Sequence, residues 1–364
     1  MRRSRQTALR LLPAALLLLL AAWPLTGCQG TASTTVENVD ADWYVLYFTT
    51  PLAPGTSADR SSGIDRNLVA LIDSAQESVD VAAYDLDLES LADAIIRAHQ
   101  AGVAVRLVTD ESNADEEAVT RLRQAGVPVV ARPDTGWGIM HNKFVVVDRQ
   151  WVWTGSWNLT YNCTYRNNNN AIVIASRALA LDYATEFEEL FAAQFGPASP
   201  ANTPHPRLRF EQAGQSAEVE VYFAPEDDVE AHLLRTLASA RSSVRFMAFV
   251  FTSAPLADAL IDLAGRGVEV QGVIESRSLD EAASQHERLR AGGVDLFADG
   301  NPYIMHHKVM VIDDQVVVMG SYNFTASANE QNDENLLIIH DPQVAAAFLA
   351  EFGRVLQEAQ TAAP

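Results

Sequence analysis

One nine-residue segment occurs twice in this chain of 364 residues. Met140–Asp148 reads MHNKFVVVD, and Met305–Asp313 reads MHHKVMVID. The two histidines, at positions 141 and 306, are 165 residues apart, and the same offset relates Ser78-Val79 to Ser243-Val244 and Gly102-Val103 to Gly267-Val268. One unit has therefore been duplicated, and the chain is long enough for two units that each bury a core.

Each copy is predicted to alternate strands with helices. Residues 78–86 and 103–110 read as strands, and residues 88–102 and 115–126 read as helices that end at a glycine. Three further β-rich runs follow in each copy, at 141–148, 151–155 and 171–176 and at 306–313, 316–320 and 334–340. The predicted fold class is α/β, with each unit a mixed β-sheet flanked by helices.

The boundaries of the two units follow from composition. The segment 197–217 is rich in Pro, Ser and Gln and lacks a clean period, which predicts a linker. The first unit is assigned to residues 43–196 and the second to residues 218–364. Two copies of one motif at equivalent points suggest a pseudo-twofold arrangement in which the motifs face each other across a shared site.

The first 27 residues are predicted to be a secretory signal. Four arginines flank the apolar run LLPAALLLLLAAWPL, which is interrupted by prolines and ends at Leu25-Thr-Gly-Cys28. A membrane span is the alternative, but it needs about 20 uninterrupted apolar residues. Leu-Thr-Gly-Cys resembles the lipobox of bacterial lipoproteins, which implies lipid attachment at Cys28. Residues 28–42 would then tether an exported protein to the membrane of the bacterial cell envelope.

Charge and cysteine content narrow the possibilities further. Without the four signal arginines, 22 of the 26 basic residues remain against 47 acidic ones, a net charge near −25. Such a charge repels polyanions at long range and disfavours nonspecific nucleic-acid binding, although a local cationic pocket remains possible. Cys163 is the one cysteine besides Cys28, so after lipidation the fold rests on its core and not on an intramolecular disulfide.

The repeated motif pairs an imidazole with an ammonium group. Residues two apart on a strand point to one face, so His141 projects with Lys143 and His306 with Lys308. An imidazole can serve as nucleophile or as general acid and base, and a lysine suits a phosphate oxygen. Two such pairs could transfer a phosphoryl group without a metal or other cofactor.

Asp148 and Asp313 complete the motif and belong to the candidate catalytic set. Each lies seven positions after its histidine, which is about 23 Å along an extended strand. An odd offset also points the side chain to the other face. A turn or core-anchoring role is therefore the favoured interpretation for both aspartates.

Further polar residues recur after the hairpin of each copy. Ser156 and Asn158, and their counterparts Ser321 and Asn323, suit a turn that lines a phosphate, with a plain loop as the alternative. Eleven residues beyond each asparagine stand Asn169 and Glu334. A carboxylate bonded to a histidine Nδ1 fixes the tautomer and stabilises the cation, so Glu334 is the stronger candidate for a histidine-orienting residue.

The pattern His-x-Lys-x4-Asp-x6-Gly-Ser-x-Asn, present in full twice, resembles the phospholipase D superfamily. The resemblance implies two α/β units with a shared active site, a covalent phosphohistidine and no metal requirement. It implies that His141 is the nucleophile, supported by Glu334 from the other half, and that His306 is the general acid. Asn169 departs from the pattern, because an acidic residue would be expected to support His306.

The substrate is less constrained than the chemistry. A lipid tether and strong acidity favour a phospholipid, hydrolysed or transferred by a single chain that is active as a monomer. Of the tryptophans near the first motif, Trp137 is the candidate for contact with a lipid interface, since Trp151 and Trp153 are expected on a partly buried strand. The alternatives are an envelope nuclease for DNA or RNA and a catalytically silent lipoprotein that binds phosphorylated ligands.

Overall fold

The computed structural model describes residues 37–40, 43–56, 63–212 and 215–362. The predicted signal segment and Cys28 lie outside these residues. Of the predicted tether, the strand β1 (Glu37–Asp40) is described. None of the helices in the described ranges combines the length and the apolar character that a membrane span requires.

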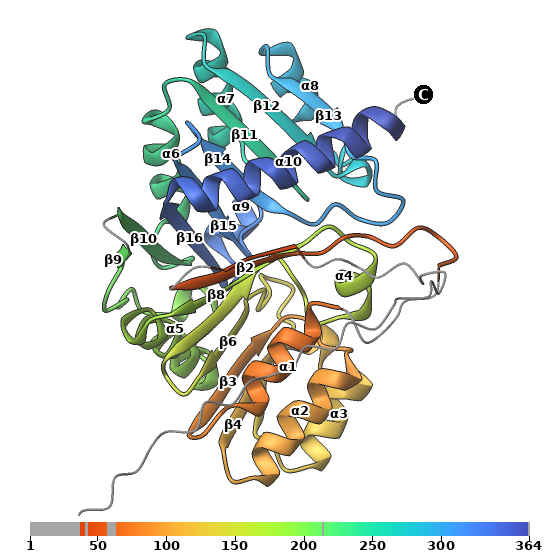
Figure 1. Ribbon diagram of the computed structural model, residues 1–364, viewed down its shortest axis with the longest axis vertical. Helices are drawn as coiled ribbons and strands as arrows, with labels where there is room; N and C mark the ends of the chain where they lie inside the picture. Colours follow the sequence, from red (N-terminus) through yellow and green to blue (C-terminus); the bar gives the residue numbers. More distant parts are fainter. Residues whose placement is uncertain (1–36, 41–42, 57–62, 213–214, 363–364) are drawn as a thin grey trace, which may run out of the picture. The chain divides into compact units, whose positions relative to one another are not determined.

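The first unit builds a sheet and the helices that cover it (Figure 1). Its elements are β1, β2 (Tyr44–Phe48), α1 (Asp65–Asp73), β3 (Ser78–Ala83), α2 (Glu89–Gln100), β4 (Ala104–Asp110), η1 (Glu111–Asn113), α3 (Glu117–Gln124), β5 (Val129–Arg132), β6 (Lys143–Val147), β7 (Trp151–Gly155), α4 (Tyr161–Tyr165), β8 (Asn170–Ala175) and α5 (Arg177–Phe191).

The second unit repeats this succession. After η2 (Gly196–Ala198) it comprises β9 (Arg207–Gln212), β10 (Gln215–Ala224), α6 (Val229–Ala238), β11 (Ser243–Ala248), α7 (Ala254–Gly265), β12 (Glu269–Ile274), η3 (Ser276–Ser278), α8 (His286–Ala291), β13 (Asp295–Ala298), β14 (Lys308–Ile312), β15 (Val316–Gly320), α9 (Ala326–Glu330), β16 (Glu334–His340) and α10 (Pro342–Ala362).

The two sheets have the same topology. The first has the strand order β1-β2-β8-β7-β6-β3-β4-β5, and the second, read from its other end, has the order β9-β10-β16-β15-β14-β11-β12-β13. Within each sheet the last three strands of this order are parallel, and the other pairs are antiparallel. The prediction of two duplicated α/β units with mixed sheets is confirmed.

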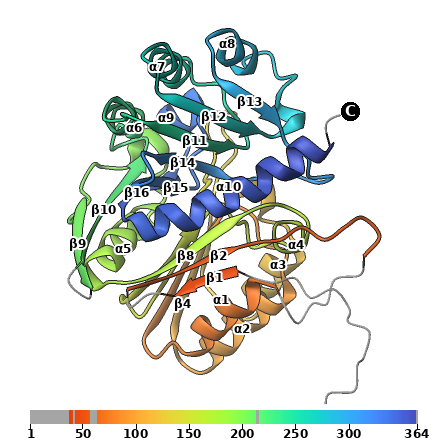
Figure 2. The same cartoon turned by 45° about the horizontal axis from the view of Figure 1, so that its top comes forward.

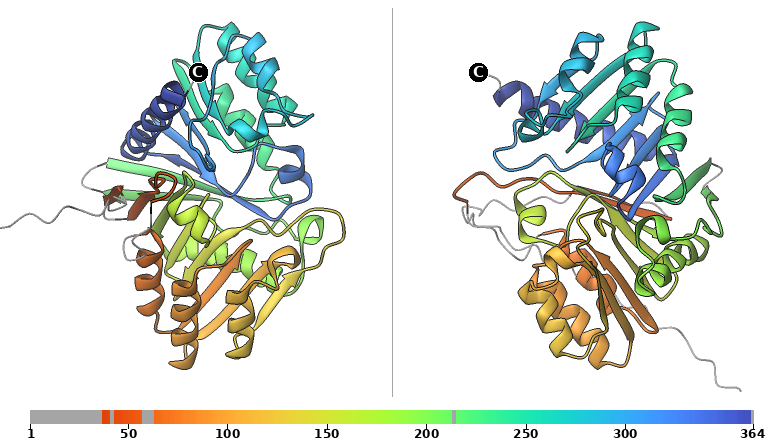
Figure 3. Two further views of the ribbon diagram at one scale, coloured as in Figure 1. Left: turned by 90° about the vertical axis from the view of Figure 1, so that its right-hand side faces the viewer. Right: turned by 180° about the vertical axis from the view of Figure 1, so that it is seen from behind.

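Alternating side chains on the central strands face two different cores. In β6, Phe144 and Val146 join a cluster that contains residues of α5, whereas Val145 and Val147 face the cluster with α1, α2 and α3. In the second unit, α10 packs on the inner face of the sheet (Figure 2). Helices α6, α7 and α8 cover the opposite face (Figure 3). Each sheet is thus buried on both sides, which suits its Val-rich and Ile-rich strands.

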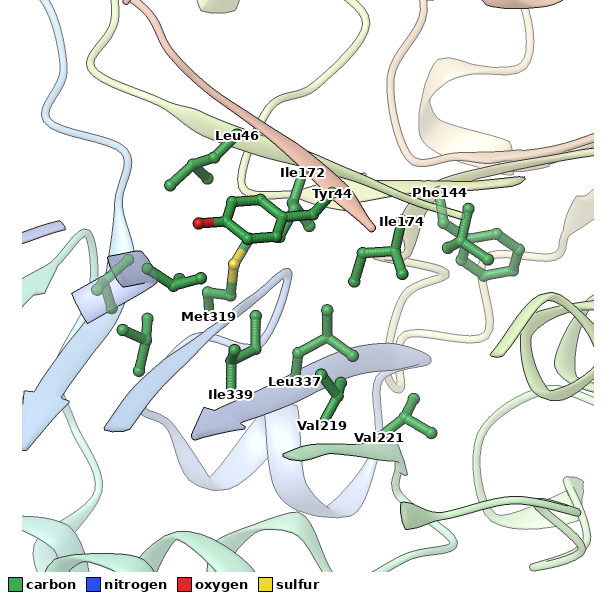
Figure 4. Packing of buried hydrophobic residues seen from close by; sticks show 14 of the residues in the cluster. Tyr44, Leu46, Phe144, Ile172, Ile174, Val219, Val221, Met319, Leu337 and Ile339 are labelled. Carbon is green, nitrogen blue, oxygen red and sulfur yellow. The ribbon is translucent and has the colours of Figure 1, made fainter. Parts of the chain in front are cut away.

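The hydrophobic cluster that contains residues of α5 and α10 is common to both units. Side chains of the first sheet, among them Tyr44, Ile172 and Ile174, lie close to Met319, Leu337 and Ile339 of the second (Figure 4). All six are at most 2 % exposed. The two units therefore share one core in addition to the separate core on the other face of each sheet. The shared core fixes the position of one motif relative to the other.

The segment predicted as a linker contains regular structure. Within residues 197–217 lie most of η2, all of β9 and the start of β10, and β9 pairs with β10 at the edge of the second sheet. The sequence RLRFEQ of β9 has no long apolar run because an edge strand leaves much of its surface in solvent. Among the residues of this segment that the structure describes, 199–206 are irregular.

Candidate active site

The loops that precede β6 and β14 carry the motif histidines, and each loop pairs with the other unit. The backbone N–H of His141 donates to Asp333 O at 3.0 Å, and that of His306 donates to Asn168 O at 2.9 Å. Isolated bridges join Met140 to Asp333 and Met305 to Asn168. Each histidine is thereby placed against the start of the last strand of the opposite unit.

His141 is oriented by a carboxylate from the second unit. Its Nδ1 lies 2.8 Å from both Oε1 and Oε2 of Glu334, and both side chains are buried. Glu334 also accepts hydrogen bonds from Ser321 Oγ at 2.6 Å and from Asn332 Nδ2 at 3.4 Å. With the Nδ1 proton directed at Glu334, Nε2 of His141 is left with its lone pair for attack on an electrophile.

His306 is oriented in the same way by an amide. Its Nδ1 lies 2.9 Å from Asn169 Oδ1 and 3.1 Å from the carbonyl oxygen of Ser156. The orientation of the Asn169 amide is consistent with this contact, since its Nδ2 donates to Cys163 O at 3.1 Å. Both partners of Nδ1 are acceptors, so Nδ1 carries the proton and Nε2 is free.

The lysines lie beside the histidines and are fully enclosed. Lys143 Nζ donates to His141 O at 2.6 Å, and Lys308 Nζ donates to His306 O at 2.9 Å. Burial lowers the pKa of Lys143 to about 8, and burial together with the Lys143 charge lowers the pKa of Lys308 well below its usual value. Such a pair of ammonium groups gains charge stabilisation from an anion such as a phosphoryl group.

Burial and the charges of the two lysines lower the pKa of both histidines. Burial lowers the pKa of His141 and of His306 well below the usual value, and the charges of both Lys143 and Lys308 lower it further in each case. Burial raises the pKa of Glu334 to about 7, against the opposing effect of Lys143. The two motif histidines and the two motif lysines therefore belong to one electrostatic site.

The serines and asparagines predicted to line a phosphate lie in two different environments. Ser156 and Ser321 are buried and bond to the histidine-orienting residues, with Ser156 Oγ 3.1 Å from Asn169 Oδ1. The Oδ1 atoms of Asn158 and Asn323 are buried without a hydrogen-bond partner among the described residues. The serines thus contact the orienting residues, whereas Asn158, which also lines a cavity beside His306, and Asn323 each keep a buried acceptor without a partner among the described residues.

Asp148 and Asp313 lie at the far ends of their strands. The carboxylate of Asp148 accepts the backbone N–H groups of Gln76, Glu77 and Ser78 at 2.7 to 3.1 Å. Asp313 does the same for residues 241 to 243. These amides lower the pKa of both carboxyls in spite of partial burial. The structure does not bring the two aspartates to the histidines, in agreement with the strand argument.

Two aromatic residues of the site were not predicted. The Tyr84 ring lies 5.0 Å from that of His141 and 5.2 Å from Lys143 Nζ. The Phe249 ring lies 4.7 Å from that of His306 and 5.0 Å from Lys308 Nζ. They are themselves 165 positions apart, and each directly follows its strand, β3 or β11, so the repeat offset applied to the residues after strand ends could have found them.

Carboxylates also hold the motif loops from behind. Asp110 accepts the Met140 N–H at 2.8 Å, and Glu275, again 165 positions later, accepts the Met305 N–H at 2.7 Å.

A cavity of about 350 Å³ opens beside His306, and Asn158, Phe249, Arg166 and Arg277 are among its lining residues. This cavity is a candidate entrance for the group bonded to phosphorus.

Two groups of side chains in the described part of the chain could hold a metal ion. They consist of Glu218, Glu220 and His340, and of Glu186, Glu189 and Glu226. Neither contains a motif histidine or lysine.

A family model for the "cardiolipin synthase, PLD-like domain" matches residues 68–191 and again residues 233–356. The two matches cover more than half of the chain, and each contains one copy of the motif. The chain belongs to the phospholipase D superfamily. For a phospholipase D family member, phosphodiesterase or phosphotransferase activity is the expected chemistry.

Relatives of this phospholipase D family member include proteins that act on lipids by name. A phospholipase D of Rickettsia bellii is 30 % identical over 151 residues, which are 41 % of this chain and 75 % of the relative. The human mitochondrial cardiolipin hydrolase is 37 % identical over 128 residues, 35 % of this chain and 51 % of the relative. The chain thus spans about half of the human protein.

The solved phosphatidylserine synthase of Haemophilus influenzae shares the fold over both units. It aligns with a TM-score of 0.61 at 12 % identity and covers 81 % of this chain and 84 % of its own. At this identity the likeness concerns the arrangement of helices and strands alone. It agrees with a duplicated architecture within one chain.

Proposed function

We propose that this protein is a metal-independent phosphodiesterase of phospholipase D type that hydrolyses, or transfers, the phosphodiester of phospholipids. The observation that supports this chemistry is the reciprocal orientation of two histidines by residues of the opposite unit, beside two buried lysines. The names of the Rickettsia and human relatives support a phospholipid substrate.

In the proposed first step, Nε2 of His141 attacks phosphorus and forms a P–N bond. The bond from phosphorus to the headgroup oxygen breaks, and His306, protonated at Nε2, gives its proton to that oxygen. Glu334 stabilises the positive charge that develops on His141. Lys143 and Lys308 stabilise the negative charge of the phosphoryl oxygens.

In the proposed second step, His306 Nε2 removes a proton from a water molecule or an alcohol. The oxygen of that molecule attacks phosphorus, and the P–N bond to His141 breaks. With water the products are the free headgroup alcohol and a phosphatidic acid. With an alcohol, the second product is a new phosphodiester.

Surface features support approach to a lipid. Trp137 is 60 % exposed, whereas Trp153 and Trp157 are buried. The loop that carries Trp137 is anchored by Arg132. This side chain donates to the Trp137 carbonyl oxygen at 3.1 Å and to Asp333 at 2.8 Å. An exposed indole on a fixed loop suits the interfacial region of a bilayer. Lipid attachment at Cys28, which would keep the protein at the envelope membrane, belongs to this proposal.

A nuclease is the second candidate. Arg166 and Arg277 line the cavity beside His306 together with Asp85 and Asp87, and the two motif lysines add positive charge at the histidines. A phosphate of DNA or RNA could enter such a pocket. The net charge near −25 of the chain without its signal weighs against a long polyanion and leaves phospholipid as the favoured substrate.

The test incubates the purified protein with phospholipid in mixed micelles and, separately, with plasmid DNA, both in EDTA. The His141→Asn variant serves as the control for catalysis. Headgroup release that the variant lacks would establish the lipid phosphodiesterase. Cleavage of DNA alone would replace it with the nuclease, and inactivity on both substrates would favour the catalytically silent binding protein.

A further inference from the structure

Three glutamates at the junction of the two units form a compact group behind the active site. Glu186 and Glu189 belong to α5, and Glu226 follows β10. Each offers a carboxylate oxygen within 4.8 Å of the other two. Glu186 and Glu189 are 3 % and 6 % exposed, so three carboxyl groups meet where water would screen their charges poorly.

The hydrogen bonds of this glutamate group leave oxygens unused. Glu186 Oε1 accepts from Asn142 Nδ2 at 3.1 Å, and Glu189 Oε2 accepts from Ser199 Oγ at 2.6 Å. Glu189 Oε1 and Glu226 Oε2 are buried and have no hydrogen-bond partner among the described residues. Arg132, a nearby cation, is engaged with Asp333 at 2.8 Å. A buried carboxylate oxygen without a partner is costly unless a cation or a proton meets it.

In the second unit, the carboxylate at the position equivalent to Glu186 is paired with a histidine and an arginine. Glu351 occupies the position 165 residues after Glu186, and it accepts from His307 at 2.9 Å and from Arg354 at 2.6 and 2.8 Å. Arg354 also bonds to Glu358 at 2.6 Å. Its guanidinium thus supplies a positive charge between two carboxylates.

The first unit has no arginine at the equivalent position. The counterpart of Arg354 is Glu189, and the counterpart of His307 is Asn142. The helices α5 and α10 otherwise correspond closely, with Phe187 at the position of Phe352. A cation in one copy has therefore been exchanged for a carboxylate in the other, at the same point of the same fold.

We propose that Glu186, Glu189 and Glu226 bind a Ca²⁺ ion, which replaces the guanidinium of the second unit. An all-oxygen, all-carboxylate ligand set selects a hard cation. Ca²⁺ accepts irregular sets of carboxylate ligands at about 2.3–2.6 Å, whereas Mg²⁺ demands near-octahedral geometry at about 2.0–2.1 Å and keeps several waters. The three carboxylate oxygens lie within 4.8 Å of one another, close enough to share one ion, and a set of carboxylates from separate points of the chain suits the less demanding Ca²⁺.

Proton sharing is the competing way to relieve the repulsion. Burial and the neighbouring acids raise the pKa of Glu226 to about 8 and that of Glu186 well above its usual value. The side chains of Glu186 and Glu226 hydrogen-bond to each other, and a proton shared between them and a bound Ca²⁺ would exclude each other. The two explanations therefore predict different responses to Ca²⁺ at mildly alkaline pH.

The site connects to the catalytic loops through neighbours in the sequence. Asn142, which contacts Glu186, follows His141, and it accepts from Asn335 Nδ2 at 2.8 Å. Since Glu186 and Glu226 come from different units, the ion would join them beside the His141 loop. Its role is structural and lies outside the reacting atoms.

The test uses the full chain in detergent at pH 8, first treated with EDTA and then freed of it. Calorimetric titration with Ca²⁺ is expected to give one site per chain, with weaker binding of Mg²⁺. Ca²⁺ at about a hundred times its Kd should raise Tm by roughly 5 °C. No heat of binding and no change in Tm would overturn the proposal.

Variants locate the ion. Glu189→Gln should lose most of the Ca²⁺ response, and Glu189→Arg, which imitates Arg354, should lose it while unfolding in EDTA at or above the wild-type temperature. Glu218→Gln, in the other carboxylate group, is the matched control and should respond like the wild type. A Ca²⁺ response that persists in Glu189→Gln and is lost in Glu218→Gln would place the ion elsewhere and refute the assignment.

Discussion

Asn169 and Glu334 occupy equivalent positions and orient the two histidines with different chemistry. The carboxylate can stabilise an imidazolium, whereas the amide of Asn169 can only accept the Nδ1 proton. This difference favours a His306 that gives up its proton readily. In a reaction where His306 is the acid, activity is therefore lost at a lower pH than a carboxylate partner would allow.

The Asn169→Asp variant tests that consequence. A carboxylate beside His306 raises the pKa of the imidazole, so the alkaline limb of the pH–rate profile should move upward by about one pH unit. The profile of kcat, measured between pH 5 and pH 9, gives the shift. An unchanged alkaline limb in a variant that remains active would mean that His306 does not supply the proton.

The Asp148→Asn variant should lower stability and spare catalysis. Asparagine tolerates the φ of +52° at this position, so the change removes charge without adding backbone strain. The free energy of unfolding should fall by only about 1 kcal/mol, because solvent screens the charge of the partly exposed carboxylate. Urea unfolding and kcat would be measured together. Asp313→Asn is the matched variant, and a folded but inactive Asp148→Asn protein would contradict the anchoring role.

The pH dependence of that difference has a definite sign. The pKa of Asp148 is lowered in the folded state, so its contribution is present above the pKa of the unfolded chain, near 4. It disappears as the pH falls through the folded-state pKa. Wild type and Asp148→Asn should therefore differ in stability at pH 7 and converge under acid conditions.

Trp137→Ala should weaken the binding of the chain without residues 1–28 to phospholipid vesicles. Removal of an exposed indole takes away interfacial contact and leaves the core unchanged. Sedimentation with vesicles gives the affinity, and hydrolysis of a soluble phosphodiester should be unaffected. Leu181→Ala is the control, since Leu181 is the other large hydrophobic residue that is markedly exposed within the described ranges, at 41 %. Equal losses in both variants would argue against a specific role for the Trp137 loop.

At the scale of elements, the strand β7 approaches β8 so closely that its last residue has no room for a side chain. A Cβ at Gly155 would lie 2.3 Å from Asn170 O, and Gly320 meets Asn335 O at the same distance. Both glycines have a φ near +150°. The close approach brings Ser156 to the backbone of Asn170, and through Asn169 it fixes His306.

Gly155→Ala should therefore destabilise the protein and reduce kcat together. The clash with backbone atoms forces β8 to shift, and the expected loss of stability is about 2 kcal/mol or more. Gly353→Ala on α10 is the control, because a Cβ there meets nothing within 4 Å, and it should stabilise the helix slightly. Thermal unfolding and turnover decide the outcome, and a Gly155→Ala protein as stable as the wild type would contradict the packing argument.

The central elements were predictable because their sequences carry a clear period. The strands β3, β4, β6 and β7 and the helices α2 and α3 lie within the predicted runs, and β8 begins one residue before its predicted run. The edge strands β5, β9 and β13 were not predicted, because short strands with one neighbour need few apolar residues. The placement of Asp148 followed from strand geometry alone, whereas the contacts of Tyr84 and Phe249 depend on how two units meet.

At the scale of the whole molecule, the shared core predicts one cooperative unfolding transition. Every tryptophan lies in the first half of the sequence, so tryptophan fluorescence reports on that unit, while far-UV circular dichroism reports on both. The two signals should change at the same urea concentration. Separate midpoints would show that the units unfold independently in spite of the common cluster.

The sequence could predict that two units face each other, because the motif occurs twice and the predicted site needs one histidine and one lysine from each copy. It could not predict which side chains fill the contact between them. Thr154 Oγ1 and Tyr183 OH both donate to Asn335 Oδ1, at 2.6 and 3.1 Å, and these bonds join residues more than 150 positions apart. Such long-range pairs leave no local period in the sequence.

The exchange of histidine partners between the units has a consequence for how this chain can evolve. In a symmetric pair of identical subunits, any substitution appears on both sides of the site at once. Here both sides are encoded separately, so Glu334 can remain beside one histidine while Asn169 stands beside the other. Covalent fusion has thus released the two catalytic positions from symmetry, and each can be adjusted to a single chemical task.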